Sequence, residues 1–216
     1  MNNFRLSGFV SGNDKVSSSN ISYLHNWIKM NGTIKIAEAG ATPFRSSNNS
    51  IFSIESGVWR LLIGDRKVIG IVGSGGVVLL NKSTQNYNNP PNKCEIVSRS
   101  VYYELPEECI HLAAADKSLL KGILDFMKLN ASNISNKWLG QCMNDGYAEV
   151  KYALEWMNVL PETVKTKFTA ISFITDTTGV SRSHALSIMK SLKQGGYIEV
   201  DGGYLVHIIK KLPDGY

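Results

Sequence analysis

The sequence predicts an α+β protein in which a β-rich N-terminal half is followed by a long helix and a helical C-terminal part that ends in a hairpin. Three observations predict this order. Short apolar runs in residues 32–103 are separated by Gly, Asn, Ser and Pro, which is typical of many short strands. From residue 116 apolar positions recur every three or four residues, the period of a helix. After residue 170, two helical segments precede two β-prone runs that flank Asp-Gly-Gly, a tight-turn composition.

The first 112 residues are expected to form a β-roll. A short helix over residues 21–30 comes first, and separate strands are then expected for TIKIAEAG, NSIFSIESG, VWRLLIG, KVIGIVG, GVVLL and CEIVSRSVYYEL. Many short strands at regular spacing are typical of a sandwich or a barrel-like roll. Residues 83–93 are expected to form a polar loop, because Asn-rich sequence with two prolines opposes both a helix and a central strand.

A long helix is predicted over residues 116–143, and residues 113–144 are assigned to it as a dimerisation element. The apolar stripe consists of Leu120, Ile123, Met127, Ile134 and Trp138, and the side chains left for solvent are Lys117, Lys121, Asp125 and Lys128. Either the stripe packs against the roll as core, or it packs against the same stripe of a second copy. A helix of this length between two domains favours the second use, so we expect a homodimer.

Residues 145–216 are predicted to form a winged helix-turn-helix. Helices are expected over residues 147–158, 170–177 and 182–192, and the strands of a hairpin over residues 197–200 and 204–208. Gly179 supplies the turn between the last two helices, and Ser181 is a suitable N-cap for the last one. Buried positions are expected at Ile171, Phe173, Ile174, Val180, Ala185, Leu186, Met189 and Leu192.

The last of these helices has the residue types of a recognition helix, which enters the major groove of DNA with its N-terminus first. Arg182 can form two hydrogen bonds to the O6 and N7 atoms of guanine, and a helix N-terminus favours a phosphate. The expected DNA-binding residues are Ser181, Arg182, Ser183, His184, Ser187, Lys190 and Lys193. The alternative is a surface helix whose polar face is merely solvated. The complete order of helix, turn, helix and hairpin favours DNA binding.

The charge of the chain permits a polyanionic partner. The net charge is +5 with a pI near 9.0, and residues 163–216 contain seven Lys and Arg and four Asp and Glu, a net charge of +3. Because this charge is modest, a monomer is expected to bind DNA weakly. We therefore expect a homodimer that binds a palindromic operator in double-stranded DNA, with two half-sites about one helical turn apart.

Several other classes of protein are not expected. The sequence has no uncharged apolar run of about 18 residues and no secretory signal, so a cytoplasmic protein is expected. Cys94, Cys109 and Cys142 are too widely spaced for a zinc or iron–sulfur site, and the four histidines have no metal-ligand spacing. No arrangement of nucleophile, base and acid can be argued, so an enzyme is not expected.

The segment GVSRSHALSIMKSLKQGGYIEVDGGYLV resembles the helix and wing of the superfamily of the cyclic-AMP receptor protein and the fumarate–nitrate regulator. Ser181 and Arg182 stand at its Ser-Arg pair, Ser183 and His184 replace Glu-Thr, and Ser187 replaces an Arg. The segment FSIESGVWRLLIGDRKVIGIVGSGG is similar to the family's roll. The resemblance implies a cyclic-nucleotide-binding-like β-roll, a dimer helix and a bacterial transcription regulator with RNA polymerase as a further partner. Among its members, the chain is similar to the divergent type represented by the inhibitor of hydrogen-peroxide resistance.

The chain also departs from this family. The stretch that matches the phosphate-binding cassette, GSGGVVLLNKSTQNY, has neither the Glu for the ribose nor the Arg for the cyclic phosphate, so cyclic-nucleotide binding is not expected. The iron–sulfur members need four cysteines, so no cofactor is expected. GIVGSGG, residues 70–76, is expected to be a turn between strands and not a dinucleotide-binding loop, because β-prone sequence follows it.

Two alternatives stay open for the roll. It is either a sensor that binds a ligand or haem, or an effector-free adaptor that binds a protein partner. Arg60, Arg66, Lys67 and Arg99 are candidates for the lining of a pocket for an anionic effector, and solvated strand faces explain them equally well.

Overall fold

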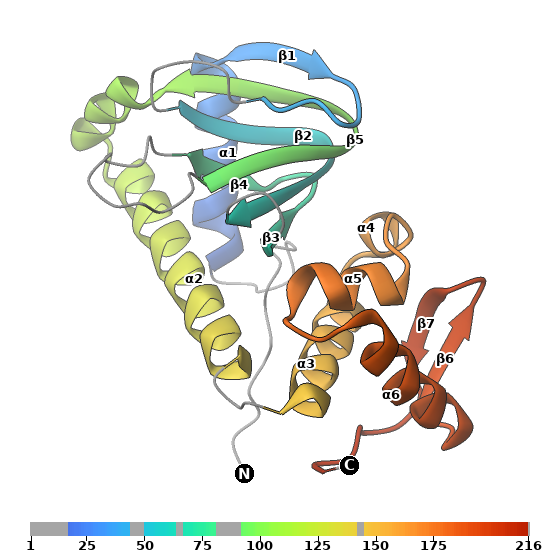
Figure 1. The fold of residues 1–216 in the computed structure, drawn as a ribbon. Coiled ribbons are helices and arrows are strands. Elements are labelled where there is room, and N and C mark those ends of the chain that lie inside the picture. Colours follow the sequence, from blue (N-terminus) through green and yellow to red (C-terminus); the bar gives the residue numbers. More distant parts are fainter. Residues whose placement is uncertain (1–16, 44–49, 64–66, 81–91, 142–144, 216) are drawn as a thin grey trace. The chain divides into compact units, whose positions relative to one another are not determined.

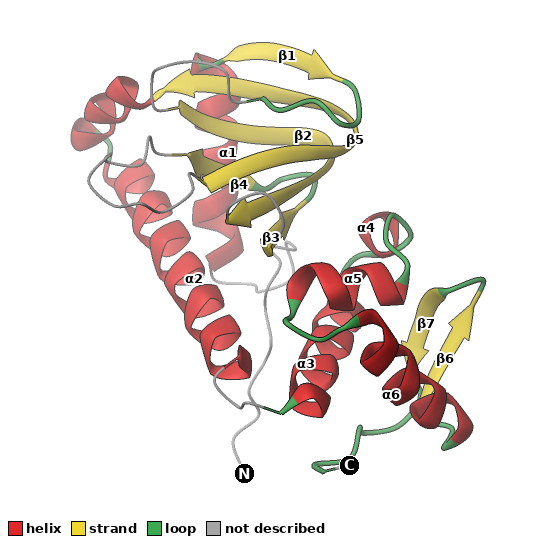
Figure 2. Cartoon of the chain, viewed as in Figure 1, coloured by secondary structure: helices red, strands yellow, loops and turns green. Residues whose placement is uncertain are grey.

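The computed structural model of the chain describes residues 17–43, 50–63, 67–80, 92–141 and 145–215. It confirms the α+β class, with a β-rich N-terminal part and a C-terminal winged helix-turn-helix (Figures 1 and 2). The chain divides into two compact units, and the division falls between Ser132 and Asn133, inside helix α2 (Lys117–Gln141). Each unit is described by itself.

The N-terminal unit is an antiparallel sheet with a helix packed on it. The sheet has the order β1-β5-β2-β3, and β4 also pairs with β2. Its elements are α1 (Ser17–Asn31), β1 (Thr33–Ala37), β2 (Ser50–Ile63), β3 (Lys67–Val72), β4 (Val77–Leu80), β5 (Asn92–Pro106) and the 3-10 helix η1 (Glu107–Ala115). Most of the predicted loop over residues 83–93 lies outside the described residues, and its last two residues already belong to β5.

Strand β2 corrects one expectation. NSIFSIESG and VWRLLIG were expected to be two strands with a turn at Gly57, but they form one strand that pairs with β5 along its whole length. Gly57 has a φ of 105°, and the register with β5 shifts on both sides of it. A Cβ atom at Gly57 would lie 1.9 Å from Ser100 Oγ on β5. The glycine is therefore required for a bulge and close strand contact, and not for a turn.

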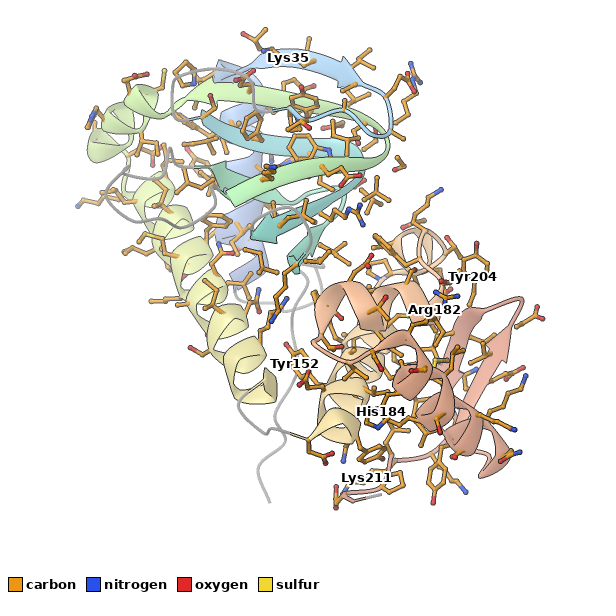
Figure 3. The ribbon with its side chains drawn as sticks, in the orientation of Figure 1. Lys35, Tyr152, Arg182, His184, Tyr204 and Lys211 are labelled. Carbon is orange, nitrogen blue, oxygen red and sulfur yellow. The ribbon has the colours of Figure 1, made fainter. Side chains whose placement is uncertain are left out.

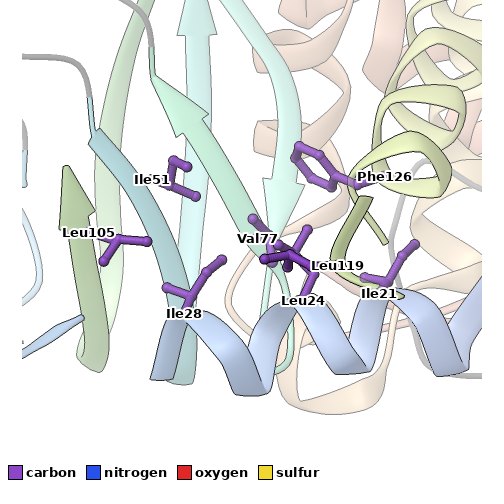
Figure 4. Close-up of a cluster of buried hydrophobic side chains, with 8 residues drawn as sticks. All are labelled: Ile21, Leu24, Ile28, Ile51, Val77, Leu105, Leu119 and Phe126. Carbon is purple, nitrogen blue, oxygen red and sulfur yellow. The ribbon is translucent and has the colours of Figure 1, made fainter. Parts of the chain in front are cut away.

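Two apolar clusters hold this unit together. The first joins α1, the sheet and α2 (Figure 4) and consists of Ile21, Leu24, Ile28, Ile51, Val77, Leu105, Leu119 and Phe126. The second lies on the opposite side of β2, because adjacent residues of a strand face opposite sides, and consists of Phe52, Ile54, Trp59, Val78, Cys94, Ile96 and Tyr102. In it the ring of Trp59 makes an edge contact with Tyr102, with centroids 4.8 Å apart, and a tilted contact with Phe52 at 5.6 Å. Aromatic rings therefore fill this side of the roll.

The C-terminal unit contains the helices and the hairpin that the sequence predicts, together with one short helix that it does not. Its elements are α3 (Gly146–Val159), α4 (Glu162–Lys165), α5 (Ala170–Thr177), α6 (Arg182–Gln194), β6 (Ile198–Asp201) and β7 (Tyr204–Ile208). Val150, Leu154 and Met157 of α3 are fully buried, and so is Ile174 of α5. Trp156 of α3 meets Phe173 of α5 edge to face, with ring centroids 5.1 Å apart. Helix α3 is thus the support on which α5 packs.

One buried position of α6 was predicted wrongly. Leu186 was expected in the core, but its side chain is 47% exposed, and Ile188, 3% exposed, is buried instead. Ala185, Met189 and Leu192 are buried as expected. The buried face of α6 is therefore rotated about the helix axis relative to the predicted one, so that Ile188 and not Leu186 lies in the core.

Candidate nucleic-acid interface

The turn between α5 and α6 is fixed by hydrogen bonds to its own helix and to α3. The hydroxyls of Thr177 and Thr178 donate to main-chain carbonyls one turn earlier in α5, at 2.6 Å and 2.7 Å. The N–H of Gly179 donates to Glu149 Oε2 of α3 at 2.8 Å, and the side chain of Val180 is buried. Because the turn is held at three consecutive points, the start of α6 has a defined position in this unit.

Helix α6 begins as the sequence predicts. Ser181 Oγ accepts a hydrogen bond from the N–H of His184 at 3.4 Å, the contact of an N-cap, and Gly195 is the C-cap of the helix. All seven side chains expected to contact DNA are exposed: Ser181, Arg182, Ser183, His184, Ser187, Lys190 and Lys193. Their contacts with DNA stay a prediction, but each of them is accessible for one.

The seven side chains do not all point the same way. Arg182 and His184 are two residues apart, so they face different sides of the helix (Figure 3). The ring of His184 lies against the start of α3, since a Cβ atom at Gly146 would be 2.7 Å from His184 Cε1 and 3.1 Å from Nδ1. By contrast, Arg182 and Lys190 lie on one row of the exposed face, two helical turns apart. His184 therefore flanks this row and does not belong to it.

The hairpin that forms the wing is tied to the helices around it. Gly202 and Gly203 at its turn have positive φ values of 53° and 89°, which is the requirement of a two-residue hairpin turn. The carbonyl of Gly203 accepts a hydrogen bond from the N–H of Ala170 at 2.9 Å. The ammonium group of Lys165, almost fully buried, donates to the carbonyl of Val206 at 2.7 Å. The wing and the recognition helix thus belong to one packed body.

The charges around α6 leave its basic side chains available. Within the described part of the chain, neither Arg182 nor Lys190 forms an ion pair. The carboxylate of Asp214, in contrast, pairs with Lys151 at 2.9 Å and with Lys211 at 3.2 Å. The hydrogen bond from Lys151, followed by the one from Lys211, lowers the pKa of Asp214 below its ordinary value. Arg182 and Lys190 are therefore available to bind an external anion, whereas Lys193 donates a hydrogen bond to the carbonyl of Val200 at 3.4 Å.

Helix α2 exposes a second candidate surface, which we call the α2 seam. Leu120, Met127 and Ile134 of the predicted stripe are 41%, 59% and 67% exposed. Ile123 packs against the cluster of the N-terminal unit instead, and the side chain of Trp138 lies outside the described residues. Asp125, expected to face solvent, is half-buried and accepts a hydrogen bond from Asn20 Nδ2 at 2.7 Å.

The sequence prediction missed one member of this seam, Leu124, which is 55% exposed. Leu120, Leu124, Met127, Ala131 and Ile134 follow one another at alternating steps of four and three residues. This is the spacing of the a and d positions of a coiled-coil heptad. The four-residue step from Leu120 and the three-residue step to Met127 are the signal that would have found Leu124.

The side chains considered for an effector pocket in the roll are placed in other ways. Arg60 pairs with Glu95 at 2.8 Å, and Arg99 pairs with Glu38 at 3.1 Å. Lys67 is exposed, and Arg66 lies outside the described residues. The described residues contain no group of three or more His, Cys, Asp or Glu side chains that could hold a metal ion. Burial raises the pKa of the Cys94 thiol, so this cysteine is held in its protonated form.

The GIVGSGG segment is a turn between strands, as expected. Its first three residues end β3, and residues 73–76 connect β3 to β4. Gly75 and Gly76 exchange main-chain hydrogen bonds with Ile54 of β2 at 2.8 Å and 2.9 Å. A dinucleotide-binding loop would instead open a helix. In the described part of the chain, no helix is long and apolar enough to cross a membrane.

Comparisons with known proteins agree with this architecture. Residues 146–214 match the family model for winged helix-turn-helix DNA binding. The chain is 25% identical over 181 residues to the inhibitor of hydrogen peroxide resistance of Salmonella typhimurium, a match that covers 79% of this chain and 81% of the relative.

Solved structures of regulators have the same fold. The c-di-GMP-responsive global regulator CLP of Xanthomonas campestris is similar with a TM-score of 0.65 at 15% identity, over 89% of this chain and 100% of that chain. FixK2 from Bradyrhizobium japonicum has a TM-score of 0.66 at 11% identity, over 83% and 93%. A transcriptional regulator of the Crp/Fnr family from Eubacterium rectale has a TM-score of 0.57 at 14% identity, over 91% of each chain.

The fold, the helix-turn-helix geometry and the sequence matches support the same assignment. The expected resemblance is confirmed at the level of the fold: the chain has the fold of solved regulators of the Crp/Fnr type, and its residues 146–214 match a winged helix-turn-helix of the DNA-binding type.

Proposed function

We propose that this DNA-binding transcription regulator acts as a homodimer that reads a palindromic operator and is not controlled by a cyclic nucleotide. The observation that carries the proposal is the exposed N-terminal turn of α6. It presents Arg182 on a well-supported helix, free of any carboxylate partner among the described residues. A location in the cytoplasm, contact with RNA polymerase and the absence of catalysis belong to the same proposal.

Base reading is assigned to Arg182 and phosphate binding to the lysines further along α6. A guanidinium forms paired hydrogen bonds with guanine, a contact that discriminates by about 1–3 kcal/mol. Ser183 and Ser187 stand where the family has longer side chains, so the operator is expected to differ from that of the better-known members. Lys190 is exposed near the middle of the helix and suits the DNA backbone.

The test is an unbiased DNA-selection experiment on the purified chain at near-physiological salt, followed by binding measurements on the selected sequence. Arg182→Ala should lose about 1–3 kcal/mol on the operator and much less on unrelated DNA. Lys190→Ala is the matched control: it should weaken binding to all sequences alike and reduce the salt dependence by about one unit. Equal losses of the Arg182→Ala variant on both DNAs would refute base reading.

The homodimer is supported by the α2 seam. Four large apolar side chains at heptad spacing are exposed on one helix, and the same seam of a second copy would cover them. In such a dimer each half-site would take one α6, with the two half-sites about 34–36 Å apart.

Sedimentation of the wild type and of Leu124→Asp tests the dimer. The wild type should sediment as a dimer, and the variant as a monomer with unchanged circular dichroism, because a side chain that is 55% exposed is not needed for the fold. Leu79→Asp, at an exposed leucine of β4, is the control and should stay dimeric. A monomeric wild type, or a dimeric Leu124→Asp, would contradict the assignment.

Independence of cyclic nucleotides is supported by the filling of the roll. Phe52 and Trp59 are fully buried and Tyr102 nearly so, and the guanidinium of Arg60 is already paired with Glu95. We expect operator affinity to be the same with and without millimolar cyclic AMP. A change of affinity, or colour in the purified protein, would favour the sensor alternative. Unchanged affinity leaves the roll as a surface for a protein partner or as a purely structural domain.

A further inference from the structure

The exposed face of α6 contains one large apolar side chain, Leu186. It is 47% exposed, whereas Ile188, Met189 and Leu192 of the same helix are 8% exposed or less. Leu186 lies one helical turn after Arg182 and one turn before Lys190, in the row formed by these two cations. An apolar side chain thus stands in the middle of the surface that the proposed function places against DNA.

The core of the C-terminal unit does not require this leucine. The positions of α6 that face α3 and the wing are already occupied by Ala185, Ile188, Met189 and Leu192, all buried. In water the exposed part of Leu186 contributes nothing favourable to folding, because apolar surface stabilises only when it leaves water. A surface in the major groove is one place where this side chain would leave water.

The base edges of the major groove offer one apolar group, the 5-methyl group of thymine, beside hydrogen-bond donors and acceptors. We propose that Leu186 reads thymine in each half-site by packing against this methyl group. The inference rests on the proposed function, because it needs α6 to lie in the major groove.

The position of this thymine follows from helix geometry. Four residues of an α-helix rise about 6 Å, and successive base pairs are about 3.4 Å apart. The thymine is therefore expected one or two base pairs from the guanine read by Arg182. Because the operator is expected to be palindromic, the same pair of bases should occur in both half-sites.

The experiment compares thymine with uracil in the selected operator. Uracil lacks the 5-methyl group and keeps the pairing and hydrogen-bonding groups, so replacing each thymine in turn isolates the methyl contact. The wild type should lose affinity about three- to tenfold at one symmetry-related pair of thymines, the range expected for burial of about one to two methyl-sized groups. At the same position, 5-methylcytosine should bind better than cytosine.

Variants at position 186 assign that effect to the leucine. Leu186→Ala should bind thymine and uracil operators equally at this position, and Leu186→Met, of similar volume, should restore a preference for thymine. Gln194→Ala, at an exposed position of α6 outside the seven expected DNA contacts, is the control and should keep the wild-type preference. Since Leu186 is exposed, the variants should melt within a few degrees of the wild type, and their circular dichroism should be unchanged.

The outcomes separate this inference from the function on which it rests. A wild type that selects no DNA sequence refutes the proposed function and this inference with it. A wild type that binds its operator but tolerates uracil at every position refutes the role of Leu186 alone. The same holds if Leu186→Ala still distinguishes thymine from uracil, in which case the exposed leucine serves another contact.

Discussion

Replacement of Gly57 by alanine tests the continuous strand β2, and Gly40→Ala is its matched control. Both glycines have positive φ, 105° and 83°, and both belong to the N-terminal unit. Their surroundings differ. A Cβ atom at Gly57 would lie 1.9 Å from Ser100 Oγ and 2.8 Å from Ser100 Cα, whereas at Gly40 it would meet no atom of the described residues within 4 Å. The pair of variants therefore separates backbone strain from steric overlap.

The expected losses follow from these two terms. A left-handed conformation costs a non-glycine residue about 1–2 kcal/mol, and this applies at both positions. At Gly57 the overlap adds about 1–3 kcal/mol, because the Cα of Ser100 is main chain and cannot rotate away. The free energy of unfolding should thus fall by about 1–2 kcal/mol in Gly40→Ala and by about 2–5 kcal/mol in Gly57→Ala.

Urea titration of the full chain measures these losses. Tryptophan fluorescence is a suitable signal, because the fully buried Trp59 lies in β2 itself. Equal losses in the two variants would refute the close contact between β2 and β5 at Gly57. A Gly57→Ala variant as stable as the wild type would also refute the bulge, and would favour the two separate strands that the sequence suggested.

Three further changes address the C-terminal unit. Glu149→Gln keeps an acceptor for the N–H of Gly179 but removes its charge, and should accelerate hydrogen exchange of that amide about fivefold; an unchanged rate would contradict the contact. Burial raises the pKa of Glu155 above its ordinary value of 4.5. The folded state therefore favours the protonated form of this group, and its contribution to stability is complete below pH 4.5 and is lost as the pH rises. Glu155→Gln should therefore raise the melting temperature at pH 7, with a gain that shrinks towards pH 4; a gain independent of pH would point to another cause. Lys165→Met removes the buried ammonium that donates to the carbonyl of Val206 and pairs with Glu162, and should cost about 1–3 kcal/mol in thermal unfolding, whereas the exposed Lys167→Met should change little.

Much of the fold could be predicted because local patterns determine it. The C-terminal unit is built from short elements with strong signals: Ser181 as an N-cap, Gly179 at the turn and Asp-Gly-Gly in the hairpin. The apolar period predicted the bounds of α2, α3, α5 and α6 to within a few residues. Helix α1 was also expected, but it begins at Ser17, four residues before the predicted start. In each case the residues that predict the element, its cap, turn or apolar stripe, lie within the element or a few residues from it.

The rest depends on contacts between distant residues. A glycine in a β-prone run is compatible with both a turn and a bulge, so the sequence does not distinguish them. At Gly57 only the close approach of Ser100 on β5 identifies the bulge. The side of α6 that is buried depends on α3 and the wing, so the exposure of Leu186 could not be inferred from spacing within α6. The orientation of His184 against Gly146 likewise joins residues far apart in the chain.

The hydrogen bonds that tie the wing to its neighbours have a thermodynamic consequence. Residues at three points of the hairpin are held: Gly203 by Ala170, Val206 by Lys165, and Ile208 by Asn158 Oδ1 at 3.0 Å. A loose arm would lose conformational entropy on meeting DNA, and that loss would oppose association. In this protein the hairpin has already lost most of that conformational entropy on folding, because the three hydrogen bonds hold it. Binding should therefore proceed with little loss of main-chain freedom, and mutations that free the hairpin should weaken DNA affinity without removing any atom that touches DNA.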